Sequence, residues 1–209
     1  MMNAAHSYLR DTEGLSFYKL MGTGRDGGFD PRPDWGTYAV LTVWDDQSKA
    51  ETYATDHPLI QAYQRRGEVY SILMRHRTSH GYWDKKNPFE QSQDIDDMNP
   101  WFAVITRARI KMSHLRRFWS YVPTSQRPLQ GAEGLIYTKG IGEVPILNMA
   151  TFSIWTDKEA LRAYAYQSTE HQKAIQMTKE YDWYAEELFA RFQPYKTVGT
   201  YNRQRMLPF

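Results

Sequence analysis

The sequence predicts an α+β protein made of two related modules in tandem, the first of which lacks its opening strand and most of its first helix. Two observations predict this fold class. The chain matches itself at a spacing of about 115 residues, and both copies alternate β-rich segments with amphipathic helical ones. A spacing of that length is the size of a small domain and far exceeds a solenoid or propeller repeat. The matching pairs, in the same order along both copies, are residues 13–19 with 133–139, 43–46 with 154–157, 55–57 with 169–171, and 81–84 with 199–202.

The second copy shows the full order of elements. Its first strand, Trp101 to Ile110, alternates apolar and polar side chains, and Ser113 can cap a helix that runs to about Tyr121. The further expected elements are strands at 133–141 and 148–155, a helix from Asp157 that restarts near Ser168, a helical stretch at 183–189, and a closing strand at 192–201. The resulting order, β-α-β-β-α-β, is the ferredoxin-like split βαβ pattern.

The first copy gives only the order β-β-α-β, with strands at 15–21, 37–44 and 71–79 and a helix near 48–70. Only 12 residues precede Glu13, whereas 32 residues, from Trp101 to Ala132, precede the matching Glu133. A strand followed by a helix needs about 25 residues, so we expect the first copy to lack that opening pair. Because an uncovered sheet edge favours pairing with another chain, we also expect a homodimer.

The expected units are a first, truncated ferredoxin-like repeat at 1–90, a linker at 91–100 and a second ferredoxin-like repeat at 101–209. Two such tandem repeats are expected to place their sheets face to face and to enclose an apolar cavity. The side chains expected to line this cavity are Met21, Trp44, Met149, Phe152 and Trp155.

Composition excludes several classes of protein. The chain has 209 residues, of which 41% are hydrophobic and 15% aromatic, enough to build a core. It contains no cysteine, which excludes disulfides, thiolate metal sites and cysteine nucleophiles. There is no apolar run of about 18 residues and no signal-peptide layout at the N-terminus, so a cytoplasmic location is expected. The net charge of +2, with basic residues clustered only at 107–117, argues against nucleic-acid binding.

Common catalytic motifs give no candidate. No Ser-His-Asp arrangement can be read from the chain. The glycine-rich run at 22–28 lacks the Gly-Lys-Ser/Thr ending of a phosphate loop and is followed by Pro31 rather than by a helix. The acidic group at 94–97 lacks the glycine and the terminal glutamate of a calcium loop. The catalytic residues therefore remain unknown at this stage.

Several long strings resemble the spheroidene monooxygenase family of carotenoid oxygenases. They are residues 19–29, 31–35, 140–143, 150–155 and 183–192. The resemblance covers nearly the whole chain from Leu15 onward and departs at the front, where family members carry an extra strand and most of a helix. It implies a fold of the dimeric α+β barrel type and a monooxygenase that uses b-type haem and molecular oxygen on a hydrophobic small molecule. Members of that family introduce a keto group into an acyclic carotenoid.

The haem that the resemblance implies would need an axial ligand. Imidazole, thiolate, phenolate and thioether groups can serve, and without cysteine the histidines come first. His171 is the leading metal ligand because it lies beside an apolar helix face, while His57 and His80 are alternates. A helix-capping histidine is the structural alternative at the place that His171 and His57 share in the two copies. His76 is interpreted as a strand residue that faces outward, and ligation by a tyrosine stays open.

The same haem would need cations for its propionates and apolar contacts for its ring. Arg107 and Lys139 are the candidate cations, and a solvated strand face is their structural alternative. Phe152 and Trp155 are the candidate ring contacts. Two other functions stay open: a cofactor-independent monooxygenase of the same barrel type, and a non-catalytic protein that binds haem or another small molecule.

Overall fold

The computed structural model describes residues 2–25, 30, 32–126, 129, 131–167, 173, 176–178 and 180–209. The helices within these residues are α1 (Met2–Leu9), α2 (Gln47–Asp56), α3 (Pro58–Gln64), a short 3-10 helix η1 (Met112–His114), α4 (Leu115–Gln126) and α5 (Lys158–Gln167). The strands are β1 (Leu15–Gly24), β2 (Pro33–Trp44), β3 (Tyr70–Gly81), β4 (Phe102–Ile110), β5 (Leu135–Val144), β6 (Asn148–Trp155) and β7 (Tyr184–Gly199).

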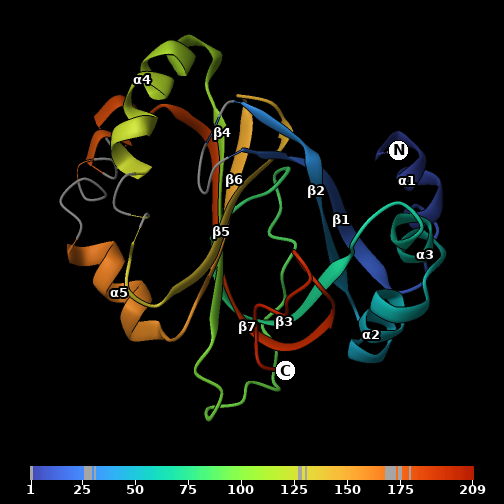
Figure 1. Ribbon diagram of the computed structural model, residues 1–209. Coiled ribbons are helices and arrows are strands. Elements are labelled where there is room, and N and C mark those ends of the chain that lie inside the picture. The colour runs from blue at the N-terminus through green and yellow to red at the C-terminus, as the bar shows by residue number, and fades with distance from the viewer. Residues whose placement is uncertain are drawn as a thin grey trace.

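These strands form one antiparallel sheet of seven strands in the order β2-β1-β5-β6-β4-β7-β3. Strand twist curls a sheet of this size, and Figure 1 shows the curled sheet between two groups of helices. α4 and α5 cover the outer face of the second half of the sheet, and α1, α2 and α3 cover the outer face of the first half. The inner face is therefore the concave side of the sheet.

The second half has the predicted ferredoxin-like topology. β4, α4, β5, β6, α5 and β7 follow one another along the chain, and the strands lie side by side as β5-β6-β4-β7. The strand that opens this unit, β4, thus lies between the third strand of the unit and its last.

The first half supplies β1, β2 and β3 and joins the second half through the β1–β5 and β3–β7 ladders. β2 and β3 are therefore the two ends of the sheet, and the described part of the first half contains no counterpart of β4. Two halves that share a curled antiparallel sheet, with helices outside, make a dimeric α+β barrel type of fold, so the predicted α+β fold class is confirmed. The unit boundaries at 1–90, 91–100 and 101–209 remain a prediction, because the sheet is continuous across them.

Two predicted helical segments are wrong. The helix expected over 48–70 is divided at His57, whose extended backbone separates α2 from α3. Pro58 explains the break, since the residue before a proline is pushed out of the helical region. The stretch at 183–189, which is rich in helix-forming residues, belongs mostly to β7. Pairing of β7 with β4 and with β3 overrides this local propensity.

The concave side of the sheet is filled by side chains from two connecting segments. Trp83 and Phe89 come from the segment after β3, and Leu207 comes from the segment after β7; all three are buried in the main core cluster. Figure 1 shows the C-terminal end of the chain close to β3 and β7. The open apolar cavity expected between the two halves is thus occupied by the protein's own residues, and burying each large side chain contributes about 1.5–3 kcal/mol.

Among the described helices, none is long and apolar enough to cross a membrane.

Candidate functional site

A charged cluster lies on the concave side of the sheet, where four strands and the turn after β3 converge. Its members are Lys19 on β1, Arg107 on β4, Glu143 on β5, Glu186 on β7 and Asp84 in the turn. Nζ of Lys19 donates to Glu143 Oε2 at 2.7 Å and to a carboxylate oxygen of Asp84. Nη1 of Arg107 donates to Glu186, and Nη2 lies 3.9 Å from Glu143 Oε1. The cluster ties both halves of the sheet together.

The turn after β3 completes this cluster. Indole Nε1 of Trp83 donates to Glu143 Oε1 at 2.8 Å. The backbone amides of Asp84 and Lys85 donate to the two carboxylate oxygens of Glu186 at 3.1 and 2.7 Å. Both residues have positive φ angles, 55° and 66°, which aim their amides at that carboxylate. The turn is therefore shaped around the partly buried carboxylate of a residue about a hundred positions further along the chain.

The electrostatics of the cluster favour the charged forms of Lys19, Asp84 and Glu186. Burial acts to raise the pKa of Glu186, but the amide of Lys85 and the guanidinium of Arg107 outweigh it, and the pKa lies below its usual value. Burial likewise opposes the charged form of Lys19, yet Asp84 and Glu143 raise its pKa. Burial acts to raise the pKa of Asp84, but Lys19 lowers it by more, so the pKa lies below its usual value. At neutral pH these side chains are charge partners of one another.

The two cations predicted to bind propionates therefore both have protein carboxylates beside them. Arg107, only 1% exposed, contacts Glu186. Lys139 on β5 donates to Asp34 Oδ2 at 2.9 Å and to the carbonyl oxygen of Arg25 at 3.3 Å. The pKa of Asp34 is lowered chiefly by its hydrogen bond from Lys139. The role of these cations toward haem remains a prediction, and in the described chain they neutralise carboxylates.

The histidines predicted as metal ligands lie in three different settings. His171 is outside the described residues and stays a prediction. His57 caps α3, with its Nδ1 accepting from the amide of Leu59 at 3.2 Å, and its ring packs on Tyr53. The sequence analysis left open that the histidine at this position caps a helix, and His57 does so. His80 is exposed near the end of β3.

His76 is the histidine that sequence reasoning misplaced. It lies on β3 opposite Phe192 of β7, and its ring centroid is 5.4 Å from that of Phe89 and 5.5 Å from that of Phe192. Both phenylalanines belong to the main core cluster, so the expectation that His76 faces outward is wrong. A signal for this was present, because Ile72 and Met74 share its face by strand alternation and also pack on that cluster.

The surroundings of the His76 ring are apolar. Both ring nitrogens are buried. Burial lowers the pKa of His76, while hydrogen bonds to the backbone at Glu90 and Thr78 act in the opposite direction. The ladder between β3 and β7 shifts register between His76 and Thr78, and such irregularities re-aim side chains and are frequent near functional sites.

The two predicted aromatic contacts lie on opposite faces of β6. Phe152 packs on the main core cluster, with its ring 6.3 Å from that of Tyr137. Trp155 is buried on the helix side of the sheet, against Leu161 and Tyr164 of α5. Positions three apart on a strand point to opposite faces, so the expectation that both line the interior is wrong for Trp155. Of the other expected lining residues, Met21 packs inside, whereas Trp44 and Met149 pack beneath the helices.

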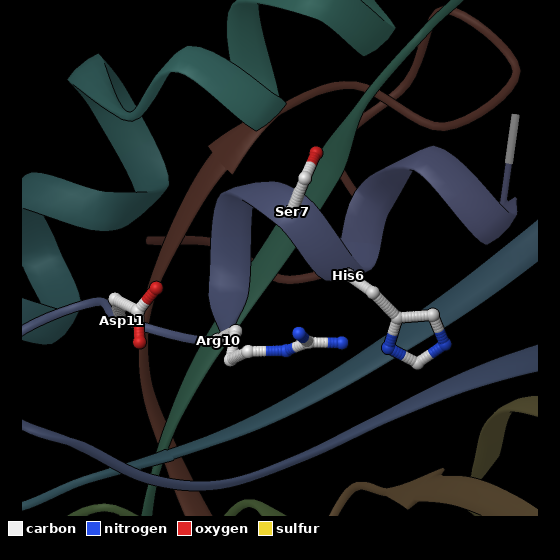
Figure 2. A pocket seen from close by; sticks show the side chains of 4 residues that line it. All are labelled: His6, Ser7, Arg10 and Asp11. Carbon is white, nitrogen blue, oxygen red and sulfur yellow. The ribbon is translucent and has the colours of Figure 1, made fainter.

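The hollow beside α1 is not a better site. A hollow of about 550 Å³ beside α1 is lined by His6, Ser7, Arg10 and Asp11, whose side chains are drawn in Figure 2. These side chains point in different directions rather than toward a common centre. Within the described part of the chain, no group of three or more histidine and carboxylate side chains is arranged to hold a metal ion. The concave side of the sheet, with His76 and the charged cluster, is the candidate site.

Comparison with known proteins identifies relatives of this chain, although no family model matches it. It is 34% identical over 185 residues to a spheroidene monooxygenase of Cereibacter sphaeroides, covering 88% of this chain and 57% of that protein. It is 34% identical over 196 residues to the spheroidene monooxygenase of Rhodobacter capsulatus, covering 92% of this chain and 81% of the relative. The Rubrivivax gelatinosus protein of the same name is 33% identical over 194 residues, which make up 92% of this chain and 73% of that protein. The chain thus spans little more than half of the Cereibacter protein.

Solved structures show weaker likenesses. A protein assigned as a monooxygenase in Fusobacterium nucleatum aligns with a TM-score of 0.45 and 14% identity, covering 95% of this chain and 86% of that one. Another, from Lactobacillus acidophilus, aligns with a TM-score of 0.43 and 9% identity, covering 95% and 87%. At such scores these likenesses add nothing to the sequence relationship.

Proposed function

Because this chain belongs to the spheroidene monooxygenase family, we propose that it is a monooxygenase acting on a hydrophobic small molecule. The observation that carries the proposal is the 34% identity to the Rhodobacter capsulatus protein over 92% of the chain. In such a reaction one oxygen atom of O₂ enters the substrate and the other leaves as water, with two electrons and two protons from an external reductant. The concave side of the sheet is apolar, and a hydrophobic substrate would bind there where the side chains of Trp83, Phe89 and Leu207 that fill it move aside.

The proposed cofactor is b-type haem. The chemistry of the described donors supports it at one point: the imidazole of His76 lies among phenylalanine side chains. Bound haem would supply the activation of oxygen. This chain would supply an imidazole donor, from the described residues or from His171, and apolar side chains such as Phe89, Phe192 and Phe152 that exclude water.

The charged cluster has a positioning role in this proposal. Arg107, Glu186 and Lys19 join β1, β4 and β7 on the concave side and hold the strands around the apolar part of the interior. Their charges lie beside one another as ion pairs, and the rest of the interior is filled with apolar side chains. We assign no proton-transfer role in the reaction to any residue of this cluster.

One observation favours a second candidate, a cofactor-independent monooxygenase. Arg107 and Lys139, the cations predicted to hold propionates, both have carboxylates beside them. In that case the substrate itself would activate oxygen, and the protein would bind and orient it. A non-catalytic small-molecule carrier would need the same apolar interior and would differ only in the absence of turnover.

We also propose that the protein is a homodimer in which the open edges of the sheet are covered. β2 is hydrogen-bonded only to β1 among the described strands, and it carries Trp35 and Tyr38 as exposed aromatics. Exposed aromatics on an open sheet edge are typical of a surface that pairs with another chain.

The test is oxygen transfer by the purified protein. We would incubate it with spheroidene, a chemical reductant and ¹⁸O₂, with and without added haem, and analyse the product by mass spectrometry. Incorporation of one ¹⁸O atom only when haem is present is the expected result. Incorporation without haem would support the cofactor-independent candidate. Binding of spheroidene with no labelled product under either condition would contradict a monooxygenase and support a carrier.

A further inference from the structure

We propose that the rim of the sheet beside α4 is a docking surface for an anionic phospholipid membrane, from which a hydrophobic substrate enters the protein. This rim surface is formed by the turn between β5 and β6, the 3-10 helix η1 and the beginning of α4. Its apolar members are Met112, Val144 and Ile146, and its basic members are Arg116 and Arg117. The inference rests on the proposed function, because it takes the substrate to be hydrophobic.

The apolar side chains of the rim surface are exposed. Met112 is 79% exposed, Val144 44% and Ile146 45%. None of the three belongs to a core cluster of the described residues. Large apolar side chains that gather at one place on a surface are typical of a site that contacts a partner or a membrane.

Contacts within the chain bring these residues to one place. The amide of Ile110, two positions before Met112, donates to the carbonyl oxygen of Leu147 at 2.9 Å. Indole Nε1 of Trp119 donates to the carbonyl oxygen of Ile146 at 3.1 Å. The turn between β5 and β6 is therefore fixed against α4 and against the residues that lead into η1.

The backbone of Ile146 indicates that this residue does not serve stability. Its φ angle is 61°, in the left-handed region that a β-branched side chain adopts only at a cost. Glycine and asparagine adopt this region much more readily. An isoleucine held there outside the core lowers the stability of the turn, and such strained residues are frequent at functional sites.

The charges around the rim surface are complementary to an anionic membrane. Between 98 and 126 the chain has five basic residues and no acidic one. Arg116 and Arg117 are exposed at the beginning of α4. Lys111 is paired with Asp182, with Nζ and Oδ2 2.6 Å apart. Each lysine or arginine held near an anionic lipid surface strengthens binding to it.

A membrane fits this combination better than a nucleic acid does. A nucleic acid would contact the arginines through its phosphates but would leave the apolar side chains of the rim surface in water. At a bilayer interface, apolar side chains enter the acyl boundary while arginines contact the lipid phosphates. Glu143, directly before Val144, belongs to the charged cluster on the concave side of the sheet. The rim surface therefore adjoins the candidate site, and a hydrophobic substrate dissolved in the bilayer has a short path to it.

The experiment is sedimentation of the full chain with vesicles, either of phosphatidylcholine alone or of phosphatidylcholine with a quarter of phosphatidylglycerol. One variant combines Met112→Ser with Ile146→Asn, and a second combines Arg116→Gln with Arg117→Gln. The matched control is Met98→Ser, which removes an exposed methionine before the start of β4, whereas the rim surface lies beyond the end of that strand. Thermal unfolding of Ile146→Asn alone is measured as well.

The wild type is expected to bind the vesicles that contain phosphatidylglycerol. Binding should weaken at least about fivefold when both arginines are replaced, since a single basic residue near an anionic surface contributes about that factor. It should weaken about tenfold in the Met112→Ser, Ile146→Asn variant, because less apolar surface enters the lipid, and stay unchanged in Met98→Ser. Ile146→Asn should melt at the wild-type temperature or above it, since asparagine suits a left-handed backbone. Weaker binding by a protein of equal stability separates docking from a structural role.

Four results would overturn the inference. They are no binding of the wild type to either kind of vesicle, binding that the rim variants leave unchanged, equal weakening by Met98→Ser, and retention by double-stranded DNA but not by vesicles. The proposed function is tested separately by turnover of spheroidene in detergent solution. Turnover without vesicle binding contradicts the docking surface alone, and vesicle binding without turnover contradicts the monooxygenase alone.

Discussion

At the scale of single residues, Arg107 is the least exposed of the charged side chains that the structure describes. It comes from β4, is almost completely buried, and contacts Glu186 on β7, with Glu143 of β5 also nearby. Two charges that are removed from water are stable only when they are paired. Removing one of them leaves the other without a partner, and its desolvation then costs a large amount of free energy. The stability of this region should therefore depend on the pair rather than on either residue alone.

We predict that Arg107→Met lowers the free energy of unfolding by about 3–5 kcal/mol, because it leaves buried carboxylates without their cation. The matched control is Lys111→Met, which removes an ion pair with Asp182 at the surface, where solvent screens the charges. Urea unfolding followed by circular dichroism measures both variants. Equal midpoints for the two would show that the buried pair contributes no more than the exposed one.

The lowered pKa of His57 predicts that the stability of the protein depends on pH. Burial lowers the pKa of the folded form, and the neutral ring accepts a hydrogen bond from Leu59 at the start of α3. In the unfolded chain the pKa is about 6.5, so the unfolded state binds more protons as the pH falls below that value. The stabilisation is therefore present above about pH 6.5 and is lost at lower pH.

We expect the melting temperature to fall between about pH 7.5 and about pH 5.5, with a shallower fall in His57→Asn. Asparagine retains an oxygen that can cap the helix but has no proton to gain. Some dependence should persist, because the pKa of His76 is also lowered by burial. Scanning calorimetry at several pH values tests this, and identical pH profiles for the wild type and the variant would contradict it.

At the scale of elements, the ends of β3 and β7 show how the two halves resemble each other in backbone conformation. Gly81 and Gly199 end these strands with φ angles of 92° and 85°. The glycines before β1 and β5, Gly14 and Gly134, have φ angles of 79° and 75°. Left-handed angles of this kind favour glycine, so matching glycines at matching positions support the repeat that the sequence suggested.

Gly81→Ala should destabilise the protein by about 2 kcal/mol or more, since a positive φ is strained for alanine. A β-carbon at this position would also lie 2.2 Å from the carbonyl oxygen of Glu187 on β7, which is too close for any side chain. Gly67→Ala is the control, because no atom lies within 4 Å of the β-carbon it would add. Thermal unfolding of both variants decides the matter, and a Gly81→Ala protein as stable as Gly67→Ala would refute the assigned turn.

Element assignment from the sequence failed where tertiary pairing decided the outcome. The segment at 183–189 has the composition of a helix, but its alternate residues Glu186 and Leu188 turn inward on β7. The break at His57 could have been predicted from Pro58. The strand β7 could not, because its stability comes from β4 and β3, which lie far away along the chain.

At the scale of the whole molecule, the sheet is open between β2 and β3. By comparison with β4, which lies between β6 and β7, the first half has room for one more strand at this place. The open edge of β2 carries Trp35 and Tyr38, which are 75% and 52% exposed. Their exposure is the structural basis of the proposed dimer.

We predict that the protein is a dimer by light scattering coupled to size exclusion, and that Trp35→Ser with Tyr38→Ser shifts it toward the monomer by at least about tenfold in dissociation constant. Met112→Ser is the control: Met112 is 79% exposed in η1, away from β2, and its replacement should leave the dimer unchanged. A wild-type protein that is monomeric at every concentration would contradict the proposal.

The sequence by itself determined the family, the α+β class and the order of the strands, since long matching strings and period-two alternation are local properties of the chain. It did not determine which face of a strand is inside, because alternation defines two faces and leaves the choice between them to packing. Only the tertiary structure placed His76 inward and Trp155 beneath α5. Only the tertiary structure also paired Arg107 with Glu186, 79 positions away, because such a contact depends on how β4 and β7 meet in the sheet.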